Sequence, residues 1–444
     1  MEDTSRSQPI STQIQEIAKQ AIEYPEMVFT TLAHRIDVEW LREAYRQTNK
    51  SSAAGIDGIT AAAYAANLDE NLQDLHRRLV SGQYKAPPVE RVWLDKEDGR
   101  KRPIGKPTFE DKIVQRAVVM LMEPIYEQEF YDFSHGFRTG HSPHQALHEL
   151  REKCRQQNIN WIIDADVSRF FDELRHDLLR EFIKRRVNDG GILRLIGKWL
   201  NAGVMEEGKL TYAEKGSPQG GVISPLAANI FLHYVLDEWY EQEVKPRLKG
   251  RSFLIRFADD FIIGCELESD ARRIMEVLPR RFDRYGLTIQ PEKTKLVKFG
   301  KPPKKEQSGP KACLERSRRN ETFDFLGFTH YWAKSRRGYW VIKRKTARKR
   351  QRRSIKSLWQ WCKENRHLPL EEQHRMLCLK LNGHYQYYGV RSNYRQLEEV
   401  YQQARRGWRY WLNRRDNHRK MVWEKFEKVL TIFALPKPRI IHAI

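Results

Sequence analysis

Paired cysteines and long apolar runs are both missing from the sequence. The 444 residues contain five cysteines, and none of them belongs to a Cys-x-x-Cys pair. An odd number of unpaired cysteines argues against a structural zinc site and against a disulfide framework, so a reducing, cytoplasmic compartment fits best. No apolar run approaches the ~20 residues that cross a bilayer, and the N-terminus has no basic stretch followed by an apolar run. We therefore expect no secretory signal and no membrane partner.

Acidic residues are scarce in the last third of the chain. The formal net charge is +22, and residues 301–444 hold 36 Lys and Arg against 12 Asp and Glu, so the rest of the chain is nearly neutral. Seven of the 12 tryptophans lie in the same region. Such a charge favours a polyanionic partner, and aromatic rings interleaved with Arg and Lys suit stacking on unpaired bases. The composition therefore predicts a nucleic-acid-binding region in the last third, although some of these tryptophans are expected in helix cores.

The spacing of apolar residues predicts an α+β fold in the first two thirds of the chain. A helical N-terminal extension over 1–60 includes a capped amphipathic helix that begins after Asp37. In 61–320 we expect a hairpin around Asp98-Gly99, then a buried strand, a helix, a second hairpin, a helix and a strand. This order is the split βαβ plan of an antiparallel sheet. The buried strand covers Asn160–Val167, and the second hairpin joins Ser252–Phe257 to Phe261–Cys265.

The last third is predicted to be mostly helical. The region 321–343 contains a strand over Thr322–Phe328 and a second strand over Tyr339–Lys343. In the region 344–444 the apolar spacing is helical, with breaks expected at Pro369 and at Gly383–Gly389. We therefore predict an all-α C-terminal domain of about three helices.

Carboxylates mark the ends of two predicted strands. The first strand carries Asp164 and Asp166, and the second hairpin has Asp259 and Asp260 at its tip. If the strand pairs with the hairpin, Asp166, Asp259 and Asp260 converge on one place, where carboxylate oxygens suit two Mg²⁺ ions. Two such ions can activate a 3′-hydroxyl and stabilise a pyrophosphate leaving group in an in-line displacement. Asp164 and Asp172 remain competing candidates, and an Asp-Asp surface turn remains the simpler alternative for the hairpin.

Three motifs in this order and spacing resemble the palm motifs A, B and C of reverse transcriptases. They are Asp166-Val-x-x-x-Phe171, Ser217–Pro225 and Phe257-Ala-Asp-Asp260. The chain further resembles the bacterial group II intron-encoded reverse transcriptase/maturases over most of its length. The segments that carry this second resemblance are Gly55–Thr60, Arg102–Thr108, Gly136–Ser142, Pro291–Lys295, Phe325–Phe328, Leu381–Gly389 and Leu435–Pro438.

The resemblance implies a right-hand polymerase. Fingers and a palm with the split βαβ sheet would occupy 61–320, a primer-grip region 321–343, and an all-α thumb/maturase domain 344–444. The implied activity is that of an RNA-directed DNA polymerase, which copies intron RNA from a DNA primer with dNTP substrates and binds that RNA to assist splicing. The implied cofactors are two Mg²⁺ ions, with Mn²⁺ as an alternative. By resemblance the catalytic residues are Asp166, Asp259 and Asp260, which together with Val167 form the metal site.

Further residues take roles by the same resemblance. The implied nucleotide site consists of Lys101, Arg102, Phe171, Gln219 and Lys293, and the implied primer or template contacts are Arg138, Phe257, Phe325, Leu326 and Gly327. Simpler alternatives remain for several of them. Phe171 could be an ordinary core residue, Lys293 a free surface lysine, and Lys96 the triphosphate contact instead of Lys101 or Arg102.

Two departures from the family pattern bear on function. Phe257 occupies a position where the family usually has tyrosine, so the ring is kept and the hydroxyl is lost. After Trp423 the sequence has a single histidine and no cysteine, so we expect the endonuclease of longer family members to be missing. Two other functions remain open: a domesticated, defence-related or diversity-generating reverse transcriptase, and an RNA-binding maturase without polymerase activity.

Overall fold

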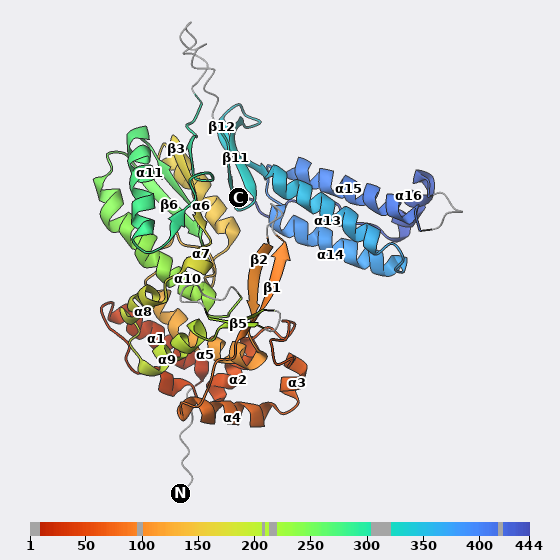
Figure 1. Ribbon diagram of the computed structural model, residues 1–444. Coiled ribbons are helices and arrows are strands. Elements are labelled where there is room, and N and C mark those ends of the chain that lie inside the picture. Colours follow the sequence, from red (N-terminus) through yellow and green to blue (C-terminus); the bar gives the residue numbers. More distant parts are fainter. Residues whose placement is uncertain (1–8, 96–100, 207–208, 213–219, 303–320, 416–420) are drawn as a thin grey trace.

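The computed structural model describes residues 9–95, 101–206, 209–212, 220–302, 321–415 and 421–444. Helices and strands alternate through the first two thirds, and helices dominate the last third, so the fold is a mixed α+β fold as predicted (Figure 1).

The N-terminal helices pack into the largest core of the molecule. The predicted cap is confirmed, because the Asp37 carboxylate accepts a hydrogen bond from the Trp40 backbone N–H at 2.7 Å. The Trp40 side chain is fully buried, and its indole N–H donates to the carbonyl of Ala117 in α5 at 3.0 Å. The helices of this part are α1 (Ile10–Glu23), α2 (Val38–Gln47), α3 (Ala61–Ala65), α4 (Leu68–Val80) and α5 (Phe109–Tyr126).

A small sheet stands beside these helices, with the strand order β2-β1-β4-β5. The predicted hairpin is present as an antiparallel pair in which Asp95 lies opposite Lys101, while its Asp98-Gly99 turn lies outside the described residues. The strands are β1 (Val89–Asp95), β2 (Lys101–Lys106), β4 (Val204–Glu206) and β5 (Lys209–Thr211).

The central sheet is the predicted antiparallel sheet, with β3 between β7 and the two short strands β8 and β9. Alternate residues of each strand point to opposite sides of this sheet, and the residues on both sides are buried. One face packs with α11 in the largest core, and the other packs with α6 and the third sheet in a second core. The elements are α6 (Pro143–Gln156), β3 (Trp161–Ser168), β6 (Ser252–Phe257), β7 (Asp260–Cys265), α11 (Glu268–Asp283), β8 (Thr288–Ile289) and β9 (Lys295–Lys298).

Between β3 and β6 the chain forms a helical layer. Its last helix is α-helical only as far as Leu232 and then continues with π-helical turns over His233–Asp237 and Tyr240–Val244. Such widened turns are rare and often mark functional regions. The other helices of the layer are α7 (Phe170–Glu173), α8 (His176–Lys184), α9 (Gly190–Leu200) and α10 (Ser224–Leu232).

The third sheet corrects the strand predicted over Thr322–Phe328. That segment is two strands, because Leu326 (φ 48°) and Gly327 (φ 78°) form a tight turn that pairs Phe325 with Phe328. Positive φ at both central residues gives the turn twist that suits a two-residue hairpin. The three strands are β10 (Phe323–Phe325), β11 (Phe328–Lys334) and β12 (Trp340–Thr346).

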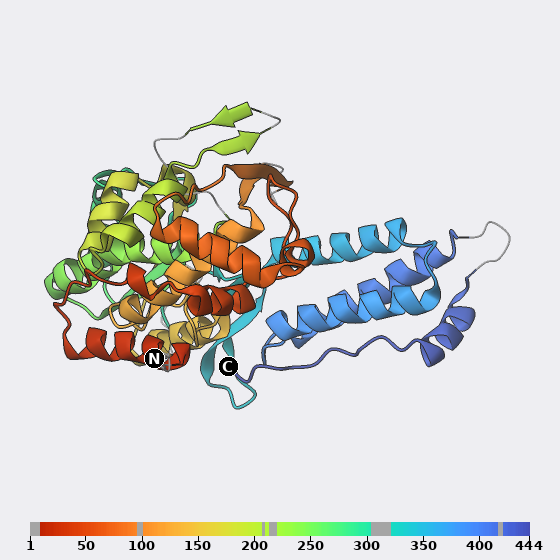
Figure 2. The same ribbon diagram turned by 90° about the horizontal axis from the view of Figure 1, so that it is seen from below.

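Four helices follow in the described part of the last third, and α13, α14 and α15 project to one side as an arm (Figures 1 and 2). They have a core of their own around Leu381, Tyr385 and Trp408. The break predicted over Gly383–Gly389 occurs at the end of that segment, because Gly383 lies inside α14 and the helix ends at Tyr388, directly before Gly389. None of the described helices combines the length and the apolar composition needed to cross a bilayer. The helices are α13 (Arg348–Glu364), α14 (Leu370–Tyr388), α15 (Tyr394–Leu412) and α16 (Trp423–Ile432).

Buried histidines make the stability of this fold sensitive to acid. The His330 ring is fully buried and stacks on Phe323 at a centroid distance of 4.9 Å. Burial, followed by the charge of Arg344, lowers the pKa of His330 well below its ordinary value. In the unfolded chain His330 is protonated as the pH falls below about 6.5, whereas in the folded protein it stays neutral. The free energy of unfolding therefore decreases as the pH falls below that value.

We expect His330→Phe, which keeps a ring in place, to remove this contribution. Urea unfolding at pH 7.5 and 5.5 measures it: the free energy of unfolding of the variant should gain on that of the parent by up to about 1.4 kcal/mol per pH unit below 6.5. The matched change His367→Phe, at an exposed histidine, should leave the difference in free energy of unfolding between variant and parent the same at both pH values. An equal pH dependence in all three proteins would contradict the assignment.

Candidate active site

The acids predicted from the sequence gather at one end of the central sheet. In the register of β3 and β7, Asp166 lies opposite Asp260, and facing residues of an antiparallel pair have β-carbons about 5 Å apart. Asp164 lies two residues earlier on the same face as Asp166. Asp259 belongs to the two-residue turn between β6 and β7. Asp172, the other candidate, is exposed in α7.

The electrostatics of this end of the sheet favour a cation. The enclosing protein raises the pKa of Asp260, and Asp164, Asp259 and Asp166 raise it further in that order. The Asp260 side chain keeps one side open to solvent, so water screens part of this effect. Burial also raises the pKa of Asp164 to about 6, with Lys295 opposing and Asp324 and Asp166 adding to the rise. A cation bound between carboxylates that raise one another's pKa reduces the repulsion between their ionised forms.

A lysine provides one positive charge at this site. The Lys293 ammonium donates to the Asp166 carboxylate at 2.8 Å, and both side chains are about half exposed. Lys293 is therefore not a free surface lysine. Within the described ranges no group of three or more His, Cys, Asp or Glu is arranged to hold a metal ion. The donor types suit Mg²⁺, and the Lys293 ammonium occupies only one of the two carboxylate oxygens of Asp166.

The turn that carries Asp259 is backbone-strained and tightly packed. Ala258 has a φ of 58°, in the left-handed region that residues with a β-carbon rarely adopt. A β-carbon at Gly136 would lie 2.2 Å from the backbone nitrogen of Ala258, so only glycine lets the 133–136 segment reach the turn. That segment also pairs with β6 through the hydrogen bond from His135 N to Arg256 O at 2.8 Å.

A buried arginine holds the acid-bearing turn in place through hydrogen bonds. The Arg256 guanidinium is fully buried and donates to Asp237 at 2.8 Å, to the Asn229 amide oxygen at 2.9 Å and to the Ala258 carbonyl at 3.1 Å. Asn229 in turn donates to the Gly136 carbonyl at 2.7 Å. These residues were not singled out from the sequence; the available signal was an arginine inside the apolar strand Ser252–Phe257.

Arg138 requires a correction. Resemblance assigns it a contact with primer or template, but its side chain is buried. It donates to Glu127 at 3.0 Å and to the carbonyls of Tyr131 and Ser134 at 2.8 and 2.7 Å. With its charge and donors used inside the protein, Arg138 shapes the loop beside the turn and does not face a strand of nucleic acid.

The loop that follows Gln219 is anchored to two other elements. Gln219 itself lies outside the described residues. The next residue, Gly220, touches β2, since a β-carbon there would lie 2.3 Å from the Gly105 carbonyl oxygen. The Ile223 backbone N–H donates to the Gln115 side-chain oxygen at 3.2 Å.

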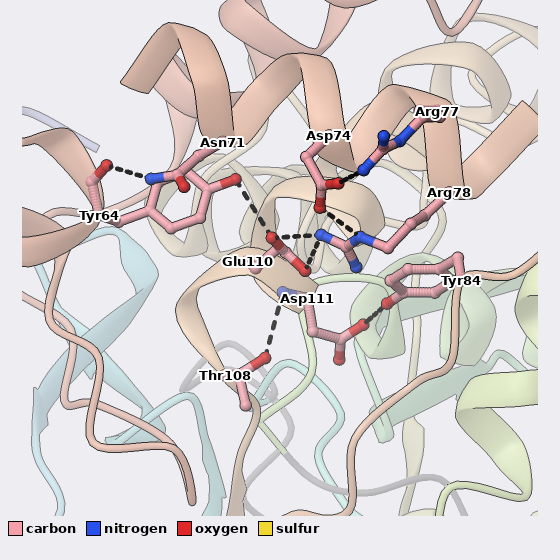
Figure 3. Close-up of polar contacts among 9 residues, drawn as sticks. All are labelled: Tyr64, Asn71, Asp74, Arg77, Arg78, Tyr84, Thr108, Glu110 and Asp111. Carbon is pink, nitrogen blue, oxygen red and sulfur yellow. Dashed lines mark hydrogen bonds and ion pairs between the residues drawn. The ribbon is translucent and has the colours of Figure 1, made fainter. Parts of the chain in front are cut away.

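Gln115 is fixed in turn by a buried carboxylate. Its amide donates to Asp111 at 2.9 Å, and the Trp199 indole N–H donates to the same carboxylate at 2.7 Å. The Tyr84 hydroxyl is a further donor to Asp111 (Figure 3). Sequence reasoning missed this support because it joins residues far apart in the chain.

The remaining nucleotide-site predictions are only partly visible. Phe171 is 8% exposed and packs edge-on against Phe170 at 5.3 Å, so it lines the core at the end of β3. Lys101 is exposed at the start of β2. The side chain of Arg102, and all of Lys96, lie outside the described residues.

The predicted primer-grip residues lie in the turn between β10 and β11. Phe325 is buried, whereas Leu326 and Gly327 form the turn itself. The Tyr387 hydroxyl of α14 donates to the Leu326 carbonyl at 2.9 Å, and the Ala347 N–H donates to the Gly327 carbonyl at 2.9 Å. The arm and the turn are therefore fastened together next to Phe257, which packs on the same core.

Comparison with known proteins decides the family. Residues 94–330, more than half of the chain, match the family described as reverse transcriptase (RNA-dependent DNA polymerase). The chain belongs to the reverse transcriptase family. It is 36% identical over 271 residues to Protein YkfC of Escherichia coli (strain K12), which covers 53% of this chain and 71% of that protein.

The other relatives confirm the resemblance to group II intron proteins. The chain is 34% identical over 305 residues to the group II intron-encoded protein LtrA of Lactococcus lactis subsp. cremoris, a match that covers 66% of this chain and 50% of that protein. It is 28% identical over 123 residues to the nuclear intron maturase 1, mitochondrial, of Arabidopsis thaliana, which covers 26% of this chain and 15% of that protein. The chain thus spans about half of the length of LtrA.

We expect Arg256→Lys to disorder the acid-bearing turn. A lysine cannot reach Asp237, Asn229 and Ala258 together, so buried acceptors lose their partners at a cost of about 2–4 kcal/mol. Urea unfolding should show that loss of stability although every acid is intact. The matched control is Arg251→Lys on the same hairpin. Arg251 has a side chain 53% exposed and pairs with Glu266, so its replacement should cost less than about 1 kcal/mol. Equal costs at the two positions would contradict a special role for Arg256.

Proposed function

We propose that this protein is an RNA-directed DNA polymerase that also binds the intron RNA it copies. The observation that supports the activity best is the placement of Asp166 opposite Asp260, with Asp259 in the adjoining turn. In this proposal 61–320 forms the fingers and palm, 321–343 the primer grip and 344–444 the thumb/maturase domain, with 1–60 as an N-terminal extension. The partners would be an RNA template, a DNA primer and dNTPs.

Each acid has a part in the proposed chemistry. Asp166, Asp259 and Asp260, together with the Val167 backbone, would hold two Mg²⁺ ions, or Mn²⁺ in their place. When bound, such ions activate the primer 3′-hydroxyl and neutralise the developing charge of the pyrophosphate. Lys293 would leave Asp166 and stand as a proton donor to the leaving group. Gln219 and Phe171 would face the incoming nucleotide, and Lys101 or Arg102 its triphosphate.

Leu326 and Gly327 would support the primer terminus, with Phe325 anchoring their turn in the core. Phe257, one residue before the turn that carries Asp259, would contact the same terminus through its ring alone. The Tyr387 hydroxyl keeps the Leu326 carbonyl in place, so the thumb would take part in aligning the primer.

Asp259→Asn and Asp260→Asn test the activity. Each keeps the shape of the side chain and removes a charge, so Mg²⁺-dependent primer extension on poly(rA)/oligo(dT) should fall by at least about 10³-fold, on the scale of removing a charged catalytic group. Binding of RNA should be nearly unchanged. Asp172→Asn, an exposed acid in α7, is the matched control and should extend primers like the parent. Loss of extension in Asp172→Asn alone would overturn the assignment, and a parent without extension would favour a maturase that has no polymerase activity.

The RNA-binding half of the proposal is supported by the distribution of exposed cations. The hairpin β11–β12 has no acid between Phe328 and Thr346, and the five residues 335–339 between its strands include Arg336 and Arg337 at the apex, with Gly338 at a φ of 82°. Among the described residues neither arginine forms an ion pair. The first turns of α13 continue the positive surface with the exposed residues Arg348, Lys349, Arg350, Arg352, Arg353 and Lys356. Tyr339, 71% exposed, adds a ring suited to an unpaired base.

The double change Arg336→Ala/Arg337→Ala should weaken RNA binding in a salt-dependent way. Loss of two phosphate contacts to a single strand lowers the slope of log affinity against log salt by about 1.4. Filter binding of the intron RNA at several salt concentrations measures this slope. The double change Arg272→Ala/Arg280→Ala on α11 removes the same charge from residues already paired with Glu268 and Glu276, and should leave the slope unchanged. Equal effects of both double variants would mean that only net charge matters.

A further inference from the structure

Phe137 is both exposed and backbone-strained beside the acid-bearing turn. Its side chain is 59% exposed, and its φ of 59° lies in the left-handed region. A positive φ is uncommon for any residue with a β-carbon and is an outlier for a bulky one. Strained residues of this kind concentrate at functional sites.

The backbone at this position is imposed by its neighbours. On one side the Gly136 carbonyl accepts from Asn229, and the Gly136 α-carbon packs against the peptide between Phe257 and Ala258. On the other side Arg138 is held by Glu127 and by two carbonyls. The chain between these anchors must turn with a positive φ, which glycine or asparagine would adopt at lower cost. The fold therefore explains the conformation of residue 137 but not the presence of a phenylalanine.

Packing within the protein does not explain the ring either. Burial of apolar surface is what makes phenylalanine favourable in a fold, and more than half of this side chain stays in contact with solvent. Phe137 is therefore unfavourable for stability in two ways, through its positive φ and through its exposed ring. It lies one residue away from Gly136, which touches the turn of Asp259.

We propose that the Phe137 ring is a contact for the nucleic-acid strand that lies at the acid-bearing turn, stacking on a nucleobase. This inference rests on the proposed polymerase function. An uncharged aromatic ring suits any base, because every base offers a π-face, and it makes no demand on sequence. A binding surface that must follow a moving primer–template needs that tolerance.

Replacing Phe137 with asparagine separates a binding role from a structural one. Asparagine relieves the backbone, so the midpoint of thermal unfolding should stay equal or rise. Binding of a fluorescein-labelled RNA-template/DNA-primer duplex, followed by anisotropy, should weaken by about 5- to 150-fold, the range that corresponds to the loss of one stacked base. Phe137→Tyr keeps the ring and should bind like the parent. Val80→Asn, which removes an apolar side chain that is 74% exposed at the end of α4, is the matched control and should change neither quantity.

Each result decides between the readings. Parent-like binding by Phe137→Asn would overturn the inference while parent extension of primers leaves the proposed function standing. A fall in thermal stability that accompanies weaker binding would also overturn it, because it would assign the ring a packing role. A parent that neither binds nor extends the duplex would remove the proposed function and the inference together.

Discussion

The buried Arg256 guanidinium joins two parts of the chain, a helix and a tight turn, through three acceptor residues. It links Asp237 and Asn229, from the helix that begins with α10, to the Ala258 carbonyl in the turn between β6 and β7. A buried ion pair is weak evidence for stability, because removing two charges from water is costly. Its geometry, however, is specific, since a guanidinium fork satisfies all three acceptors in one arrangement only. The position of Asp259 and Asp260 depends on that arrangement.

Negative and positive side chains are gathered in two separate zones of this fold. Carboxylates concentrate at one end of the central sheet, where burial, followed by the charges of neighbouring carboxylates, raises the pKa of Asp260 and of Asp164. Exposed arginines and lysines concentrate on the β11–β12 hairpin and on α13, beside that end. Arg350 is near enough to lower the pKa of Asp260, which shows how closely the two zones approach. Under the proposed function, an RNA held on the positive zone would lie beside the carboxylates, and divalent cations bound there would offset the repulsion between the two.

The sequence predicted the elements that follow a simple period and missed those that depend on distant partners. The strand that carries Asp166 and the hairpin of Asp259 were predictable, because alternating apolar residues and a tight acidic turn are local patterns. The turn at Leu326 was not, since it sits inside an apolar run and is stabilised by Tyr387 from another part of the chain. The break predicted over Gly383–Gly389 occurs only at its last residue, because a single glycine such as Gly383 is tolerated within a packed helix. Arg138, Gln115 and Asp237 could not be placed, because burial decides their roles and only the folded chain shows it.

The attachment of the helical arm to the Leu326–Gly327 turn has a mechanical consequence. The 19 residues of α14 form a rod about 28 Å long, and the end of that rod bonds to the turn through Tyr387. A rod pivoting at one end converts a wide swing of its far end into a small displacement at the pivot, with the reduction set by the ratio of lengths. Under the proposed function, an RNA bound at the far end of the arm would therefore exert a torque on α14 that reaches the Leu326–Gly327 turn as a small displacement.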